Sequence, residues 1–198
     1  MKNRKLSRRN FLKTAGAGGI GAVLAPHFPI RKAAGAQGEI VGVPARPFGK
    51  TGVDVSILGM GGMFDIPNNQ IILKQALRLG ISYWDTANSY GYGRSEEGIG
   101  KFFSRYPEQR KDVFLVTKSG DSDPFGLSSD LEKSLRRMQT SYIDLFFLHG
   151  IRSSRSLTKE IRNWADEAKE KGKIRFFGFS THSRSEEHTS ELQSLLII

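Results

Sequence analysis

Short apolar runs separated by stretches of helical spacing are the main structural signal of this chain, from Val41 onward. Their starts lie 26, 32, 30 and 31 residues apart, which is the length of a strand, a helix and two loops. The runs are VSIL (55–58), ISYW (81–84), VFLVT (113–117), IDLFFL (143–148) and IRFFGF (174–179). Five β/α units in a row predict a parallel sheet covered by helices, and the pattern fits either a doubly wound sheet or an eight-fold barrel.

Three helices with clear apolar spacing and one hairpin are predicted between and before these runs. The first helix is expected to be capped by Asn68 or Asn69 and to end at Gly80, and the second is expected to follow Ser129. Residues 45–58 predict a hairpin that turns at residues 49–52. The expected inward-facing helical residues are Ile72, Ala76, Leu79, Leu131, Leu135, Met138, Leu157, Ile161, Trp164 and Ala168.

The net charge of +10 is concentrated at the N-terminus. Residues 1–36 contain eight basic residues and no acidic one, so the remainder of the chain carries only +2. Basic and acidic residues are interspersed in that remainder, and no basic stripe is interleaved with aromatic residues. This distribution argues against nucleic-acid binding.

The N-terminal charge belongs to a recognisable pattern. Arg8 and Arg9, in SRRNFLK (7–13), precede an apolar Gly/Ala-rich segment (14–25), and AAGA (33–36) offers an Ala-x-Ala cleavage site. This resembles a twin-arginine signal, which predicts export to the periplasm by the twin-arginine export machinery. The alternative is a basic disordered tail. The apolar segment is shorter than the about 20 residues of a spanning helix, so no stable membrane span is expected.

Chemically useful residues follow the predicted strands. In parallel β/α folds the loops at the carboxyl ends of the strands converge on one face. The residues there are Gly59 to Met63, Asp85 with Tyr90, Lys118, His149, and Ser180 with Thr181. Each alone has an ordinary structural explanation, such as a helix cap or a solvated lysine. Together they bring an acid, a phenol, an ammonium and an imidazole to one rim.

This set of groups suits proton transfer to a carbonyl oxygen. A phenol, with an ordinary pKa of about 10, is a weak acid at neutral pH unless a nearby cation favours the phenolate, and Lys118 is placed to supply that charge. Asp85 is expected to hold Lys118, and His149 to orient the carbonyl by a hydrogen bond. The loop between Asp85 and Tyr90 is expected to bring the phenol over the same pocket.

A diffusible cofactor is expected to supply the remaining reactivity. The chain has no cysteine, which excludes disulfides, thiolate metal sites and cysteine nucleophiles. Its four histidines, His27, His149, His182 and His188, are accompanied by no His-x-His or carboxylate cluster, so no metal site is predicted. With neither reactive group available, a cofactor becomes the expected reagent.

Five segments resemble successive landmarks of the aldo/keto reductases across residues 45–182. They are RPFGKTGVDVSILGMGGM, YWDTANSYGYGRSEE, VTKSG, LEKSLRRMQTSYIDLFFLHG and GKIRFFGFSTH. The resemblance implies a (β/α)8 TIM barrel with an N-terminal hairpin, and reduction of a small aldehyde or ketone by NADPH, with NADH not excluded. It also implies a catalytic tetrad of Asp85, Tyr90, Lys118 and His149, in which Tyr90 is the general acid.

The same resemblance implies a set of cofactor-binding residues. These are Gly61, Gly62, Met63, Asp85, Ser180 and Thr181, of which the last two would meet the nicotinamide carboxamide. Two positions depart from the family pattern: Thr181 stands where asparagine is common and lacks its paired donor and acceptor, and Gly62 stands where threonine is common. The alternative function is a cofactor-binding regulatory protein on this fold, as the channel-associated family members illustrate.

The loop after Asp85 has its own local signals. Gly91 and Gly93 are expected to let the backbone turn tightly. Ser95 is then expected to cap a short helix, with Glu96 and Glu97 in its first turn.

The predicted barrel stops after about five units. Residues 184–194 read RSEEHTSELQS, with no apolar period, and the string resembles the translation of a common sequencing-adapter oligonucleotide. We therefore expect three parts: a signal peptide (1–36), a partial barrel (37–183) and a non-native tail (184–198). By the resemblance to the aldo/keto reductases, the strands expected to be missing would supply most contacts to the adenosine phosphate of the cofactor.

Overall fold

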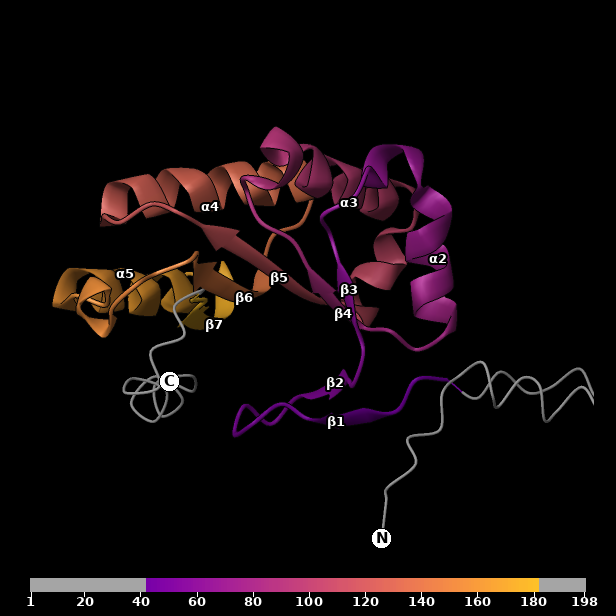
Figure 1. Ribbon diagram of the computed structural model, residues 1–198, viewed down its shortest axis with the longest axis horizontal. Helices are drawn as coiled ribbons and strands as arrows, with labels where there is room; N and C mark the ends of the chain where they lie inside the picture. The colour runs from indigo at the N-terminus through magenta and orange to yellow at the C-terminus, as the bar shows by residue number, and fades with distance from the viewer. Residues whose placement is uncertain (1–41, 182–198) are drawn as a thin grey trace, which may run out of the picture. The chain divides into compact units, whose positions relative to one another are not determined.

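The computed structural model describes residues 42–181. The predicted signal peptide and the predicted non-native tail both lie outside these residues. Within the described part, a two-stranded hairpin precedes a five-stranded sheet, and helices alternate with the strands of that sheet (Figure 1).

The five-stranded sheet is parallel, and its spatial order follows the chain: β3, β4, β5, β6, β7. The strands are β3 (Gly59–Gly61), β4 (Tyr83–Asp85), β5 (Phe114–Ser119), β6 (Ile143–Leu148) and β7 (Ile174–Phe179). The helices are α2 (Gln70–Arg78), α3 (Arg94–Arg105), α4 (Pro124–Met138) and α5 (Lys159–Glu170). Short 3-10 helices are η1 (Ile66–Asn68), η2 (Tyr90–Gly93), η3 (Pro107–Asp112) and η4 (Ser154–Ser156).

The first parallel strand differs from the predicted one. VSIL was expected to begin the parallel sheet, but Val55 and Ser56 belong to β2 (Asp54–Ser56), which pairs antiparallel with β1 (Ala45–Pro47). The predicted turn is confirmed, with Gly49 at φ 56° and Gly52 at φ 72°. The parallel strand is instead Gly-Met-Gly, which has no apolar run and forms because its backbone pairs in register with β4.

Two helices also differ in detail from the predictions. In α2, Leu73 and Ala76 face the core, whereas Ile72 is 42% and Leu79 39% exposed. Helix α4 begins at Pro124, earlier than expected, because the Asp123 carboxylate caps it by accepting from two backbone N–H groups, at 2.9 and 3.1 Å. The expected inward residues of α4 and the three expected within α5 are buried: Leu131, Leu135, Met138, Ile161, Trp164 and Ala168.

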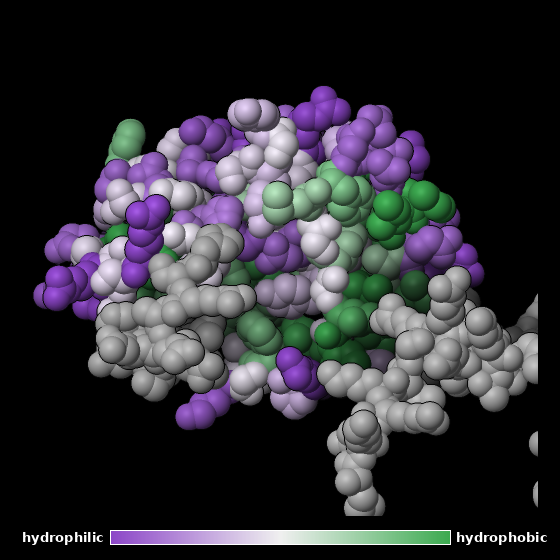
Figure 2. All heavy atoms as spheres, viewed as in Figure 1, coloured by the Kyte–Doolittle hydropathy of each residue, from purple (hydrophilic) through white to green (hydrophobic). Residues whose placement is uncertain are grey.

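Alternation along the strands divides the core into two parts. Leu115 faces the helices and joins the larger apolar cluster, while Phe114 and Val116 face the other side, where Phe48 of the hairpin loop packs. Figure 2 shows apolar surface just above the hairpin. Ile57 and Leu58, which follow β2 in the chain, are 51% and 55% exposed. Whether a polar side chain of a strand points toward the helices or toward the other face of the sheet therefore depends on its position in this alternation.

Aromatic packing ties β4 to the helical layer. Trp84 is fully buried, and its ring lies 5.3 Å from that of Phe102 and 5.9 Å from that of Phe103, both in α3. Because large buried aromatic side chains contribute strongly to packing, this contact fixes β4, and the residue that ends it, against α3. Among residues 42–181, no helix combines the length and the hydrophobicity needed to cross a membrane.

Candidate active site

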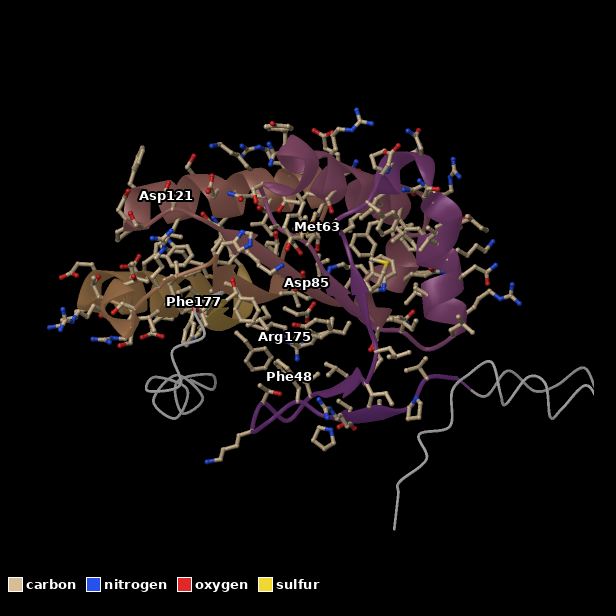
Figure 3. All side chains as sticks on the ribbon, viewed as in Figure 1. Phe48, Met63, Asp85, Asp121, Arg175 and Phe177 are labelled. Atoms are coloured by element: carbon tan, nitrogen blue, oxygen red, sulfur yellow. The ribbon has the colours of Figure 1, made fainter. Side chains whose placement is uncertain are left out.

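Asp85 and Lys118 occupy the same face of the sheet. Asp85 is the last residue of β4, and Lys118 lies within β5, one residue before its end rather than beyond it as the sequence suggested. Val116 pairs with Asp85 in the register of the two strands, so Lys118, two residues further, points to the same side. In Figure 3, Asp85 lies near the middle of the view, between the labels of Met63 and Phe48.

The Lys118 ammonium is buried and surrounded by oxygen atoms. Its side chain is 7% exposed, and its Nζ pairs with the Asp85 carboxylate. The same Nζ donates to the carbonyl oxygen of Thr86 at 2.8 Å and to the Tyr90 hydroxyl at 3.3 Å. Because a buried charge is costly unless it is paired and hydrogen-bonded, these three contacts offset the cost of burying Lys118 and fix its position.

Tyr90 is delivered by a tight loop that returns the chain to the rim. The predicted turn at the glycines is confirmed, since Gly91 has φ 58° and Gly93 has φ 94°, and Tyr92 between them is also left-handed at φ 57°. The Tyr90 ring lies under the Lys118 ammonium, 4.8 Å from ring centroid to Nζ. The two glycines adopt this backbone without steric cost, but left-handed backbone is uncommon for an L-residue such as Tyr92, and surrounding contacts must hold it.

His149 completes the group on the far side of the tyrosine. It directly follows β6, and its backbone N–H donates to the carbonyl oxygen of Ser119 at 2.8 Å. Its imidazole meets the Tyr90 ring edge-on, with centroids 5.8 Å apart and planes at 73°. The structure thus brings all four residues expected for the tetrad to one rim, although they come from positions as distant as residues 85 and 149.

The expected cofactor residues lie at both ends of this rim. Gly61 ends β3 with open space where a side chain would point, whereas a Cβ at Gly62 would lie 2.7 Å from Ser95 Oγ and 2.8 Å from the Asp85 carbonyl oxygen. A threonine, the residue common at this position in the family that the sequence resembles, would therefore not fit at position 62. Met63 is 78% exposed.

Ser180 and Thr181 follow β7 at the other end of the rim. The Ser180 hydroxyl accepts from the backbone N–H of Gly150 at 2.9 Å, so its own proton is still available to a ligand. Thr181 is exposed.

Two open depressions flank the tetrad. One, of about 390 Å³, adjoins the tyrosine, and the other, of about 400 Å³, adjoins the histidine. The first is lined by Gly62, Met63, Phe64, Asp65, Tyr90, Gly91, Arg94 and Ser95. The second is lined by Asn88, Ser89, Gly120, Asp121, Ser122, Asp130 and His149. A substrate in either depression would approach the phenol or the imidazole directly.

A second tyrosine below the site has a perturbed pKa. Burial, and after it the negative charge of Asp85, raises the pKa of Tyr83 above its ordinary value of about 10. Tyr83 packs against Phe114 with its ring stacked at a centroid distance of 5.6 Å. Tyr83 therefore stays neutral and forms an apolar floor under Asp85. No group of three metal-ligating side chains occurs between residues 42 and 181.

The predicted role of Ser95 at the start of α3 is wrong, and the burial of Glu96 there was not predicted. Ser95 does not cap α3, whose N-cap is Gly93; its hydroxyl donates to the Gly62 carbonyl oxygen at 2.8 Å and is hydrogen-bonded to Thr86 Oγ1 at 2.6 Å. Glu96 is fully buried instead of lying in a solvated first turn. The missed signal was helical periodicity, because Glu96 shares one face of α3 with Ile99 at i+3 and Phe103 at i+7.

Comparisons with known proteins agree with this arrangement. A sequence profile described as "Aldo/keto reductase family" matches residues 58–194, and a profile of the TAT (twin-arginine translocation) pathway signal sequence matches residues 5–25. Uncharacterized oxidoreductase YqkF of Bacillus subtilis is 34% identical over 151 residues, covering 69% of this chain and 48% of that protein. The NADP(+) aldo-keto reductase yakc of Schizosaccharomyces pombe is 33% identical over 150 residues, covering 70% and 42%.

A solved structure has the same fold. The holo form of aldo-keto reductase AKR11C1 from Bacillus halodurans superposes with a TM-score of 0.64 at 33% identity, covering 71% of this chain and 51% of that one. The predicted fold is confirmed as a TIM-barrel-like α/β arrangement with an N-terminal hairpin. The chain spans about half the length of the curated relatives it matches.

Proposed function

Because this chain belongs to the aldo/keto reductase family, we propose that it carries the proton-transfer residues of an NAD(P)H-dependent carbonyl reductase. The substrate would be a small aldehyde or ketone and the product the corresponding alcohol. The observation that supports this most directly is the contact of one buried ammonium, Lys118, with both the Asp85 carboxylate and the Tyr90 hydroxyl.

Tyr90 would act as the general acid. Its O–H bond would break as the proton moves to the carbonyl oxygen of the substrate, and the phenolate left behind would lie 3.3 Å from the Lys118 ammonium. That positive charge would stabilise the phenolate. Asp85 would keep Lys118 in place, and His149, next to the phenol, would orient the substrate oxygen by a hydrogen bond.

A reduced nicotinamide, when bound, would supply the hydride for the carbonyl carbon. The residues present fit one end of such a cofactor: the open space beside Gly61, the exposed Met63 and the available Ser180 proton all border the rim. Asp85 and Thr181 would complete this set. The NADP(+) in the name of the yakc relative favours NADPH.

Export is proposed for the same protein. The match of the twin-arginine signal profile to residues 5–25 supports passage through the export machinery of that pathway to the periplasm. This route carries folded proteins, which suits a reductase that acquires its cofactor in the cytoplasm, where the cofactor is made.

We also propose that the 198-residue chain is inactive by itself. The five parallel strands of residues 42–181 leave two sheet edges, at β3 and β7, without a partner strand in that part of the chain, whereas a closed barrel has no edge. We expect a 198-residue product to aggregate or to be loosely packed, and to show no turnover.

Cofactor oxidation tests the proposed function. A full-length protein that contains this chain would be mixed with NADPH or NADH and a panel of aldehydes and ketones, and the loss of reduced-nicotinamide absorbance would be followed. Substrate-dependent oxidation, with the alcohol recovered as product, is the expected result. Tight binding of the cofactor without turnover of any substrate would favour the regulatory alternative and refute the reductase.

A further inference from the structure

Asn88, two residues before Tyr90, is held at three of its atoms. Its backbone N–H donates to the carbonyl oxygen of Lys118 at 3.0 Å. Its side-chain amide donates to the carboxylate of Asp130 at 2.5 Å, and its own backbone carbonyl oxygen accepts from Arg137 at 3.3 Å. Asp130 and Arg137 both belong to α4, so this helix grips the start of the loop that carries Tyr90.

Arg137 also contacts the other end of that loop. A Cβ added at Gly93 would overlap the Arg137 guanidinium, so the guanidinium is packed directly against the Gly93 backbone. Gly93 is left-handed, as are the two residues before it. One side chain therefore touches both sides of the strained turn that sets the position of the phenol.

Buried Glu96 fixes the guanidinium in turn. Its side chain is 0% exposed, and it pairs with Arg137 at 3.2 Å. Its other oxygen accepts from the hydroxyl of Thr117, which immediately precedes Lys118, at 2.7 Å. Because a buried carboxylate requires such partners, the location of Arg137 is tied to the strand that supplies the ammonium.

We propose that Arg137 is a positioning residue, which holds the Tyr90 hydroxyl beside Lys118 by clamping residues 88 and 93. Its kinetic consequence rests on the proposed reductase function. Left-handed backbone at Tyr92, between the two permissive glycines, persists only when neighbouring groups impose it. Without the clamp the loop relaxes, the phenol moves away from the ammonium, and a displacement of about 1 Å is enough to reduce turnover about 100-fold.

The first test compares two neighbouring arginines in the full-length protein. Arg137→Ala removes the clamp, and Arg136→Ala is the matched control, since Arg136 is exposed on the same helix. We expect Arg137→Ala to lower kcat about 10- to 100-fold, with the dissociation constant of NADPH unchanged. Arg136→Ala should leave both quantities at their wild-type values.

Chemical rescue separates positioning from a general loss of structure. Millimolar guanidinium, far below denaturing concentrations, should restore part of the turnover of Arg137→Ala, because it can occupy the space beside Glu96. Urea has the same shape but no charge and should restore much less. Equal recovery with the two compounds, or recovery with neither, would overturn the positioning role.

A double variant covers the case in which Arg137→Ala fails to fold. Glu96→Gln combined with Arg137→Met leaves no unpaired buried charge, and the side-chain amide oxygen introduced at position 96 can still accept from Thr117. We expect this protein to fold and to keep a low kcat. Wild-type kcat in either variant would overturn the inference while leaving the reductase function intact.

Amide hydrogen exchange tests the clamp without turnover. We expect the segment 86–93 to exchange faster in Arg137→Ala than in Arg136→Ala, and equal rates would overturn the inference. If the wild-type protein reduces no carbonyl compound, the proposed function fails, and this measurement still decides whether Arg137 holds the loop.

Discussion

Replacing Tyr90 with phenylalanine isolates the proposed acid from the packing around it. The change removes one hydroxyl, whose hydrogen bond to Lys118 is long, at 3.3 Å. The ring keeps its place under the ammonium, 4.8 Å from Nζ, and edge-on to His149 at 5.8 Å. Lys118 keeps Asp85 and the Thr86 carbonyl oxygen as partners, so no buried charge is left unpaired.

The expected losses of stability and of activity therefore differ widely. One hydrogen bond contributes about 0.5–1.5 kcal/mol to folding, and the free energy of unfolding should fall by no more than that. General acid catalysis contributes about 10²- to 10⁴-fold to the rate. At about 1.36 kcal/mol per tenfold, the loss of the acid raises the activation barrier by about 3–5 kcal/mol.

The assay measures kcat, the dissociation constant of NADPH and the unfolding midpoint of Tyr90→Phe in the full-length protein. We expect kcat to fall at least about 100-fold, with binding and stability nearly unchanged. Wild-type turnover in this variant would remove Tyr90 from the acid role. A loss of cofactor affinity as large as the loss of kcat would also refute the reasoning, because the ring and its contacts are retained.

Three further predictions concern other parts of the chain. Lys118→Met should suppress turnover and alter chiefly the pH dependence of turnover. An unchanged pH–rate profile would contradict the proposal that Lys118 favours the phenolate of Tyr90. The pKa of Tyr83 is raised in the folded protein, so the unfolded chain loses the phenol proton first as the pH rises. The free energy of unfolding should therefore fall above about pH 10, by up to about 1.4 kcal/mol per pH unit. Urea unfolding at successive pH values should give a flatter slope for Tyr83→Phe than for the wild type, and equal slopes would disprove this prediction. Replacing Arg8 and Arg9 with lysine should trap the precursor in the cytoplasm on cell fractionation, and unchanged export would mean that the signal is misread.

Local patterns were sufficient for much of the site. Strands β6 and β7 have the predicted bounds, because each is an apolar run long enough to be recognised without its neighbours. Strand ends also placed Asp85, Lys118 and His149 on one rim, since the carboxyl ends of parallel strands lie together. The interpretation of these residues and Tyr90 as a catalytic tetrad came from the resemblance to the aldo/keto reductases, and it stays a proposal.

Strand β3 required the tertiary structure. Gly-Met-Gly has neither the β-branched residues nor the alternation that predicts a strand, and the adjacent VSIL has both. The structure assigns VSIL to the hairpin and its following turn, and gives the first position in the parallel sheet to the glycines. What decides this is pairing with β4, where Gly59 lies opposite Tyr83 and a Cβ would approach its ring to 3.2 Å.

Glu96 illustrates the limit of local reasoning most clearly. A glutamate in the first turn of a helix is ordinarily exposed and favoured by the helix dipole, so its neighbours in the sequence predict a solvated side chain. It is buried because Arg137, 41 residues later in the chain, supplies a compensating charge, and Thr117 a hydrogen bond. The sequence by itself determined which groups reach the rim; only the tertiary structure decided which groups hold them there, because the cost of burying a charge depends on partners that no local pattern contains.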